Sequence, residues 1–187
     1  TVNGKPLPLP VSPSGGVRRL RSLGVGFVPE DRKEEGLFLG LPISYNIAIE
    51  LHSASGALAV AKGYRKVVSD IMSSLNVRAT GASMVVSALS GGNQQKVLLG
   101  RYLAAELDVL IVEEPTRGVD VGAKSEIYKL LRDFAARGGA VLILSRETVE
   151  MIGLCDRLYV IHGNTVVAEM PAENATEHVI LDAALSA

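Results

Sequence analysis

The sequence predicts an α/β fold with a mostly parallel sheet and flanking helices. Short apolar runs of strand type alternate with amphipathic segments of helical period, which is the pattern of such folds. The runs Val109–Val112 and Ala140–Leu144 show no apolar–polar alternation, as expected for strands that are covered on both faces. With 187 residues, 48% of them hydrophobic, the chain can build one core, so we expect one domain or most of one.

In the first half of the chain, proline, glycine and basic residues over 1–23 predict a loop. Gly24–Val28 reads as a short buried strand that opens into a charged loop at Glu30, and a short helix is expected over Ser44–Leu51. The clearest helix is Lys62–Asn76, where apolar residues recur at i, i+3, i+4, i+7, i+8 and i+11. We expect this stripe to pack in the core or against the domain's own sheet.

In the second half, a helix should begin just after Ser90-Gly91-Gly92 and run to about Ala105. Another helix is predicted from Gly122 to Arg137, where Gly138-Gly139 ends it before the second buried strand. The remaining elements are a hairpin, Leu158–Ile161 with Thr165–Ala168, and a terminal helix from about Thr176 to Leu185.

Charge and composition exclude several classes of partner. The formal net charge is −1, from 19 basic and 20 acidic side chains, so no global field attracts nucleic acid. The single cysteine, Cys155, and the lack of a leader in this sequence favour a reducing, cytosolic compartment. No apolar run reaches the ~20 residues that span a bilayer, so a membrane role would require docking onto another subunit.

Charged residues follow three of the predicted strands. Glu113 and Glu114 follow one strand, Arg146 and Glu147 follow the next, and Glu30 with Asp31 follow the first. In an open parallel sheet, ligands bind outside the carboxyl ends of the strands. Carboxylates gathered there suit a Mg²⁺-bound nucleotide, because a hard cation takes oxygen ligands and an attacking water needs a base.

The segment Leu89–Lys96, here called the signature loop, makes this interpretation more specific. Two glycines at a helix start leave backbone N–H groups accessible, the helix dipole adds positive potential, and the Ser90 hydroxyl can donate. Such a turn is suited to hold a phosphate. An ordinary helix N-cap is the alternative for Ser-Gly-Gly alone, and the Glu-Glu-Pro-Thr-Arg-Gly-Val-Asp block that follows at a domain-scale interval argues against it.

These motifs resemble those of ATP-binding-cassette (ABC) ATPases. Leu89–Lys96 matches the ABC signature, Val109–Glu114 resembles Walker B with its adjacent catalytic glutamate, and Gly118-Val119-Asp120 resembles the D-loop. Together with Val28–Leu37 and Thr116–Lys124, they are similar to the second ATPase domain of the fused ATPases of ribose-, galactose- and xylose-type importers. The similarity runs from about Gly4 to the C-terminus.

The resemblance implies a role for each motif residue. Ser90, Gly91 and Gly92, with Gln94, would contact ATP held by a facing domain, since ABC sites are shared across a head-to-tail pair. Glu114 would polarise the attacking water, Glu113 would serve Mg²⁺, and Asp120 would couple the two sites. Glu30 occupies the place of the Q-loop glutamine and Arg146 that of the switch histidine. The implied fold is a P-loop NTPase-like ABC domain with a signature-helix subdomain.

The sequence departs from the family pattern at three points. It contains no G-x-x-x-x-G-K-[ST], and the chain begins at Thr1, so we expect a fragment that starts after Walker A. Walker B normally ends Asp-Glu, whereas here the aspartate is replaced by Glu113. Arg146 cannot act as a base near neutral pH but could neutralise phosphate charge.

We therefore expect 1–187 to be a partial nucleotide-binding domain. Residues 41–105 would form the helical signature subdomain, 24–30 and 106–170 the α/β core, and 171–187 the C-terminal helix. The expected function is an ATPase segment of a sugar importer at the cytoplasmic face of the membrane, with ATP and Mg²⁺ as cofactors. Expected partners are a second ATPase domain, permease subunits and, indirectly, an external sugar-binding protein, but no nucleic acid. One alternative is a degenerate, non-catalytic half that acts as a structural or allosteric partner. A soluble ABC ATPase of translation or DNA repair ranks last, because the basic tracts or long coiled-coil insertions expected of it are not visible in the sequence.

Overall fold

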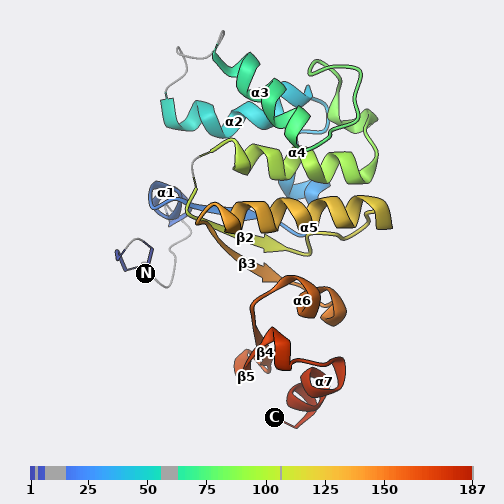
Figure 1. The fold of residues 1–187 in the computed structure, drawn as a ribbon. Coiled ribbons are helices and arrows are strands. Elements are labelled where there is room, and N and C mark those ends of the chain that lie inside the picture. Colours follow the sequence, from blue (N-terminus) through green and yellow to red (C-terminus); the bar gives the residue numbers. More distant parts are fainter. Residues whose placement is uncertain (3, 7–15, 56–62, 106, 187) are drawn as a thin grey trace. The chain divides into compact units, whose positions relative to one another are not determined.

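The chain forms two compact units, Thr1–Leu142 and Ile143–Ala187. The structure, a computed structural model, describes residues 1–2, 4–6, 16–55, 63–105 and 107–186 (Figure 1). In the first unit β1 (Val25–Val28) runs parallel to β2 (Val109–Glu113), with Val25 opposite Val109. Strand β3 (Ala140–Leu144) lies on the other side of β2, which gives the sheet order β1-β2-β3. The α/β fold predicted from the sequence is confirmed.

Helices form the rest of the first unit. Figure 1 shows α2 (Ile43–Ser55) and α3 (Gly63–Ser74) packed on α4 (Gly91–Leu103), with α5 (Val121–Ala136) beside the sheet. All four predicted helices are present, with bounds within a few residues of expectation, except that α2 is longer than the sequence indicated. The α3 stripe packs on α2 and α4 rather than on the sheet.

The core of the first unit surrounds α4. Helix α2 packs on α4, and both helices and β2 contribute fully buried aliphatic residues. These residues are Val97, Leu98, Leu99, Ile43, Ile47, Leu110 and Val112. Full burial of each such aliphatic side chain contributes about 1.5–3 kcal/mol. Helix α4, which begins at the signature loop, is therefore held firmly by the hydrophobic core.

A buried polar contact fixes the segment between β1 and α2. The Arg101 guanidinium donates to the Gly36 carbonyl, to the Asn46 carbonyl at 2.9 Å and to Asn46 Oδ1 at 3.0 Å. Asn46 is itself fully buried and accepts from the Phe38 backbone at 2.9 Å. Burial lowers the pKa of Arg101. Because its charge is paired with several oxygen acceptors, the guanidinium can remain in the core.

The sequence was wrong about two features of this unit. Residues Gly16–Ser22 form a helix, α1, where a loop was expected. The strands are also less covered than predicted: β2 alternates between buried and half-buried residues, and β3 has no buried residue. On β1, Phe27 is 46% exposed.

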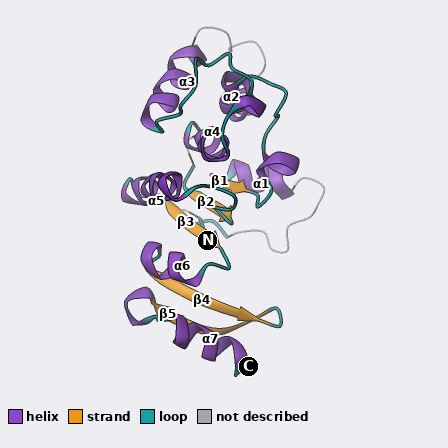
Figure 2. Cartoon of the chain, turned by 90° about the vertical axis from the view of Figure 1, so that its right-hand side faces the viewer, coloured by secondary structure: helices purple, strands orange, loops and turns teal. Residues whose placement is uncertain are grey.

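The second unit is a hairpin with two helices. Strand β4 (Arg157–His162) pairs antiparallel with β5 (Thr165–Pro171), and positive φ values at Gly163 and Asn164 suit a tight two-residue turn. Helices α6 (Thr148–Leu154) and α7 (Glu177–Leu185) complete it, and Figure 2 shows α7 alongside the hairpin. The hairpin and the terminal helix are confirmed, whereas α6 was not predicted.

None of the helices in the described part of the chain is both long and apolar enough to cross a membrane.

Candidate functional site

Ser90 occupies the N-cap of α4, but its side chain makes no capping hydrogen bond. Glu147 at the N-cap of α6 makes no cap either. Three other N-cap side chains do cap: Asp31, Asp120 and Thr176 each accept from a backbone N–H of the helix that follows. Serine at an N-cap normally does the same. The Ser90 side chain is exposed, so the ordinary N-cap interpretation does not account for its hydroxyl.

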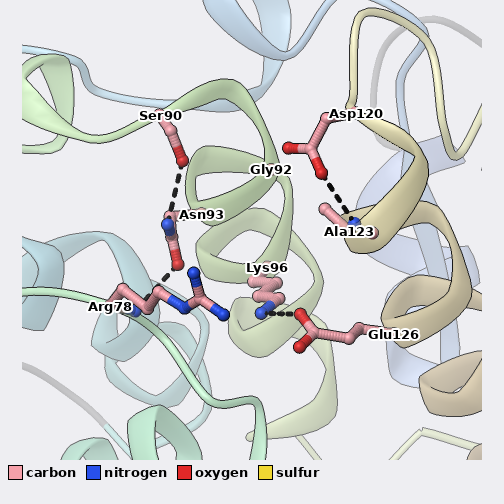
Figure 3. A pocket seen from close by; sticks show the side chains of 9 residues that line it. Arg78, Ser90, Gly92, Asn93, Lys96, Asp120, Ala123 and Glu126 are labelled. Carbon is pink, nitrogen blue, oxygen red and sulfur yellow. Dashed lines mark hydrogen bonds and ion pairs between the residues drawn. The ribbon is translucent and has the colours of Figure 1, made fainter.

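The Ser90 hydroxyl instead ends a short chain of side-chain hydrogen bonds (Figure 3). Asn93 Nδ2 donates to Ser90 Oγ at 2.9 Å, and Asn93 Oδ1 accepts from the backbone N–H of Arg78 at 2.8 Å. Ser90 and Asn93 are three residues apart and therefore share one face of the helix start. This chain links the segment after α3 to the tip of α4.

The two glycines of the signature loop allow close packing within the domain. A Cβ on Gly92 would lie 2.6 Å from the Ala123 Cβ of α5, closer than carbon atoms can approach. A Cβ on Gly91 would lie 2.8 Å from both the Gly118 carbonyl oxygen and Arg32 Nη2. The sequence explained these glycines by access of a phosphate to the backbone, but the tight contacts alone already require them.

The Glu114–Asp120 loop connects β2 to α5. Glu114 has a φ of 42°, a left-handed conformation that is uncommon for a residue with a side chain and that clusters at functional sites. The loop is closed by hydrogen bonds from Arg117 N to Glu114 O at 3.1 Å and from Val119 N to Thr116 O at 3.2 Å. At its far end Asp120 caps α5 through Ala123 N at 3.0 Å. Glu113 and Glu114 are both half-buried at the carboxyl end of β2.

The loop after β1 contacts the Glu114–Asp120 loop through an ion pair and two hydrogen bonds. Glu30 forms an ion pair with Arg117, and Arg32 donates from Nη1 to the Arg117 carbonyl at 2.6 Å and from Nη2 to the Gly118 carbonyl at 3.2 Å. Partial burial lowers the pKa of Arg32. Glu30 is therefore tied to the Glu114–Asp120 loop through Arg117.

A polar cavity of about 240 Å³ lies between the starts of α4 and α5. Ser90, Gly92 and Asp120, three of the predicted site residues, line it together with the ion pair of Lys96 and Glu126 (Figure 3). Lys96 is 3% exposed and also donates to the Asn76 carbonyl at 3.0 Å. This hydrogen-bonded ion pair lowers the pKa of Glu126.

Gln94 and Arg146, two of the other predicted site residues, are not among the residues that line this cavity. Gln94 is buried, and its amide donates to the carbonyls of Val86 at 3.2 Å and Leu89 at 3.3 Å, so it supports the chain leading into the signature loop. Arg146 is exposed and lies just after β3, in the second unit. The nucleotide contacts assigned to both residues stay predictions.

Sequence reasoning missed Asn93, Arg32 and the Lys96–Glu126 pair. A signal existed for Asn93, because residues three apart at a helix start face each other. No sequence signal pointed to Arg32, whose partners lie 85 and 86 residues away. The same is true of Lys96 and Glu126, which meet because α4 packs against α5.

Solved structures of ATP-binding cassettes have the same architecture. One is a dimeric cassette in a post-hydrolysis state bound to ADP and Pi, with a TM-score of 0.68 at 21% identity, covering 79% of this chain and 62% of that one. Another, the ADP conformation of a cassette from an ABC transporter, has a TM-score of 0.67 at 20% identity, covering 89% and 66%. The fold is that of an ABC ATPase domain.

Curated relatives of this chain are named as import ATP-binding proteins. A ribose import ATP-binding protein of Streptomyces avermitilis is 41% identical over 176 residues, which are 93% of this chain and 34% of that protein. A ribose import ATP-binding protein of Rhizobium meliloti is 44% identical over 160 residues, 84% of this chain and 31% of that protein. The chain thus spans about a third of the length of these curated relatives. No protein-family model matches it.

Proposed function

We propose that this chain is the segment of a sugar-importer ATPase that contributes the signature loop, Walker B and the D-loop to shared ATP sites. The observation that carries the proposal is the Ser90 hydroxyl, which is exposed at the tip of α4 and makes no cap. It lies on the same cavity as Asp120, at the end of the loop that begins at Glu114. Ser90 serves the γ-phosphate of a nucleotide held by a facing domain, as the resemblance to ABC signatures implies.

Glu114 acts on the attacking water. A carboxylate at the end of β2 can accept a hydrogen bond from water and orient it for in-line attack on the γ-phosphorus. The left-handed backbone at Glu114 supports this role, because such strain persists where the surrounding structure holds a side chain in a required direction. Asp120 and Arg117 belong to the same loop and transmit its position to α5 and to Glu30.

The donor set at the end of β2 fits Mg²⁺. The half-buried Glu113 and Glu114 offer carboxylate oxygens, and Mg²⁺ characteristically takes one or two carboxylates and completes its shell with phosphate oxygens and water. The described residues contain no cluster of three or more His, Cys, Asp or Glu that would hold a metal without a nucleotide. Glu113 would hold the ion, which would neutralise charge on the transferred phosphate.

The names of the relatives support the partners that we propose. The relatives are named as ribose import ATP-binding proteins, and a structure with this fold is a dimer bound to ADP and Pi. We therefore assign this chain a facing ATPase domain, permease subunits at the cytoplasmic face of the membrane and, indirectly, an external sugar-binding protein. Glu30, which forms an ion pair with Arg117, stands at the position of the Q-loop glutamine in the resemblance. We assign it to the surface that faces the permease.

The proposal is tested by replacing Ser90 with alanine in the full-length native polypeptide assembled with its permease subunits. Removal of one preorganised donor from a phosphoryl-transfer site should lower the Mg-ATPase rate at least about tenfold. Ser87→Ala is a matched control, since Ser87 is an exposed serine three residues earlier. If Ser90→Ala and Ser87→Ala have equal rates, the assignment of the signature loop is wrong.

A second candidate function is a non-catalytic half that supports a catalytic partner. Glu113 favours it, because the longer side chain stands where family members have aspartate and could displace the metal. Glu114→Gln separates the candidates, with Glu173→Gln as a matched exposed control. A fall in the ATPase rate of about a hundredfold or more supports catalysis, and an unchanged rate supports the non-catalytic half.

A further inference from the structure

We propose that Asn93 is a positioning residue that sets the Ser90 hydroxyl as a hydrogen-bond donor toward an anionic oxygen. This inference rests on the proposed function, because the acceptor is a phosphate oxygen of the facing nucleotide. It adds that the hydroxyl hydrogen of Ser90 points in a defined direction and that the Asn93 side chain determines this direction. Ser90, Asn93 and Arg78 all line the cavity, and Figure 3 shows hydrogen bonds joining Ser90 to Asn93 and Asn93 to Arg78.

The polarity of these hydrogen bonds, meaning their donor–acceptor direction, follows from the backbone N–H of Arg78, which can act only as a donor. A backbone N–H can donate but cannot accept, so the Arg78 N–H, 2.8 Å from the Asn93 side chain, must face the amide oxygen. The orientation of the Asn93 amide is thereby fixed by its surroundings, which is how such amides are assigned. Its NH₂ group then faces Ser90 Oγ at 2.9 Å and donates to it.

This polarity determines what Ser90 can do. A hydroxyl has one hydrogen and two lone pairs, and here Asn93 occupies a lone pair. The hydrogen cannot point at Asn93, because the NH₂ group there offers no acceptor. Since the side chain makes no cap and is exposed, the hydrogen is directed outward and available to an acceptor that approaches the tip of α4.

The catalytic value of this arrangement is preorganisation. A hydroxyl that rotates freely must be oriented when the phosphate arrives, whereas a hydroxyl with one direction already occupied by a donor has fewer orientations to lose. Donors that are fixed before the reaction stabilise developing charge most effectively. Loss of one neutral hydrogen bond of this kind should change the rate by about three- to tenfold.

The test is a double-mutant cycle measured as kcat and KM for Mg-ATP in the full-length native polypeptide with its permease subunits. The variants are Asn93→Ala, Asn93→Asp, Ser90→Ala and the two combinations with Ser90→Ala. Asn93→Asp is nearly isosteric and keeps an acceptor for the Arg78 N–H. It also offers an acceptor to Ser90, so the hydroxyl hydrogen turns inward and the polarity of the chain is reversed.

Asn93→Ala should lower kcat/KM about three- to tenfold when Ser90 is present and less than about twofold when Ser90 is alanine. Asn93→Asp should lower kcat/KM more than Asn93→Ala does. The difference in kcat/KM between these two variants should be smaller in the Ser90→Ala background. The difference that remains there measures the effect of the added charge alone. Thermal unfolding of each variant checks that the domain is folded.

The outcomes separate this inference from the proposed function. If Ser90→Ala itself leaves the ATPase rate unchanged, the proposed function fails and this inference fails with it. If Ser90→Ala lowers the rate but the Asn93 effects are the same in both backgrounds, Asn93 acts on folding or on the Arg78 segment, and this inference alone is overturned. Non-additive losses support it.

Discussion

Lys96 is a residue of the signature loop that makes its contacts inside the domain. It is 3% exposed and pairs with Glu126 of α5. A buried ammonium is tolerated when it is paired and hydrogen-bonded, and here Asn76 supplies a further carbonyl acceptor. The last residue of the signature loop thus joins two helices.

Glu126→Gln should lower the free energy of unfolding by about 1 kcal/mol at pH 7, because the Glu126 side chain is 38% exposed and water screens part of the loss. The folded-state pKa of Glu126 is lowered below 4.5, first by the hydrogen bond from Lys96. A lowered pKa gives stability that is fully present above pH 4.5 and is lost as the pH falls through the folded pKa.

Urea unfolding of the wild type and of Glu126→Gln at several pH values measures this effect. The difference between them should be constant above pH 4.5 and should narrow below it. Asp133→Asn is the control, since Asp133 forms an exposed ion pair with Lys129. A difference that persists unchanged into acid would contradict the role of the Glu126 charge.

Among the secondary-structure elements, the contact between α4 and α5 fixes the site. Gly92 allows α4 to approach Ala123, and the same approach places Ser90 and Asp120 on one cavity. The loop after β1 supports this contact through Arg32, which bonds to the Gly118 carbonyl and lies against Gly91. The loop after β1, the start of α4 and the start of α5, which are distant in sequence, therefore meet through the Arg32 side chain and the close packing at Gly91 and Gly92.

Gly92→Ala should destabilise the protein by about 1–3 kcal/mol, because its new Cβ would overlap the Cβ of Ala123. Ala123→Gly removes that atom and should cost about 1 kcal/mol by itself, through helix propensity. The double variant should lose less stability than the sum of the two single losses, because the new Cβ at position 92 no longer overlaps a Cβ at position 123. Thermal unfolding of the four proteins provides the cycle, and additive losses would show that the two residues do not press on each other.

At the scale of the whole molecule, the 187 residues include the signature loop and a segment that resembles Walker B, but they contain no G-x-x-x-x-G-K-[ST]. That missing motif supplies the backbone N–H cradle and the lysine that hold the β- and γ-phosphates. The residues gathered on the cavity between α4 and α5 include two acidic groups, Asp120 and Glu126, beside their basic neighbours. This charge balance gives little attraction for a free triphosphate.

A polypeptide of these 187 residues should therefore bind Mg-ATP weakly, with a dissociation constant of about 1 mM or higher. Isothermal titration with Mg-ATP measures this, and the full-length native polypeptide is the positive control. Micromolar affinity in the 187-residue polypeptide would mean that its own residues hold the phosphates.

Much of the fold followed from local patterns. The six-position apolar stripe predicted α3, Gly163 with Asn164 marked the hairpin turn, and Ser90-Gly91-Gly92 marked the start of α4. Helix α1, the half-buried face of β2 and the exposed face of β3 were not predicted. Coverage of a sheet depends on which elements pack on it, and an apolar run looks the same whether one face is covered or both.

By itself, the sequence determined the order of elements, the ABC motifs and the positions of Ser90, Glu114 and Asp120 within them, because helical period, strand type and motif spacing are local properties. The tertiary structure decided how these residues are used. In the structure the Ser90 side chain makes no cap and accepts a hydrogen bond from Asn93. Gly92 packs closely against Ala123, and Arg32 donates a hydrogen bond to the Gly118 carbonyl. Contacts between residues far apart in the chain depend on helix packing to within an ångström, which no local pattern encodes.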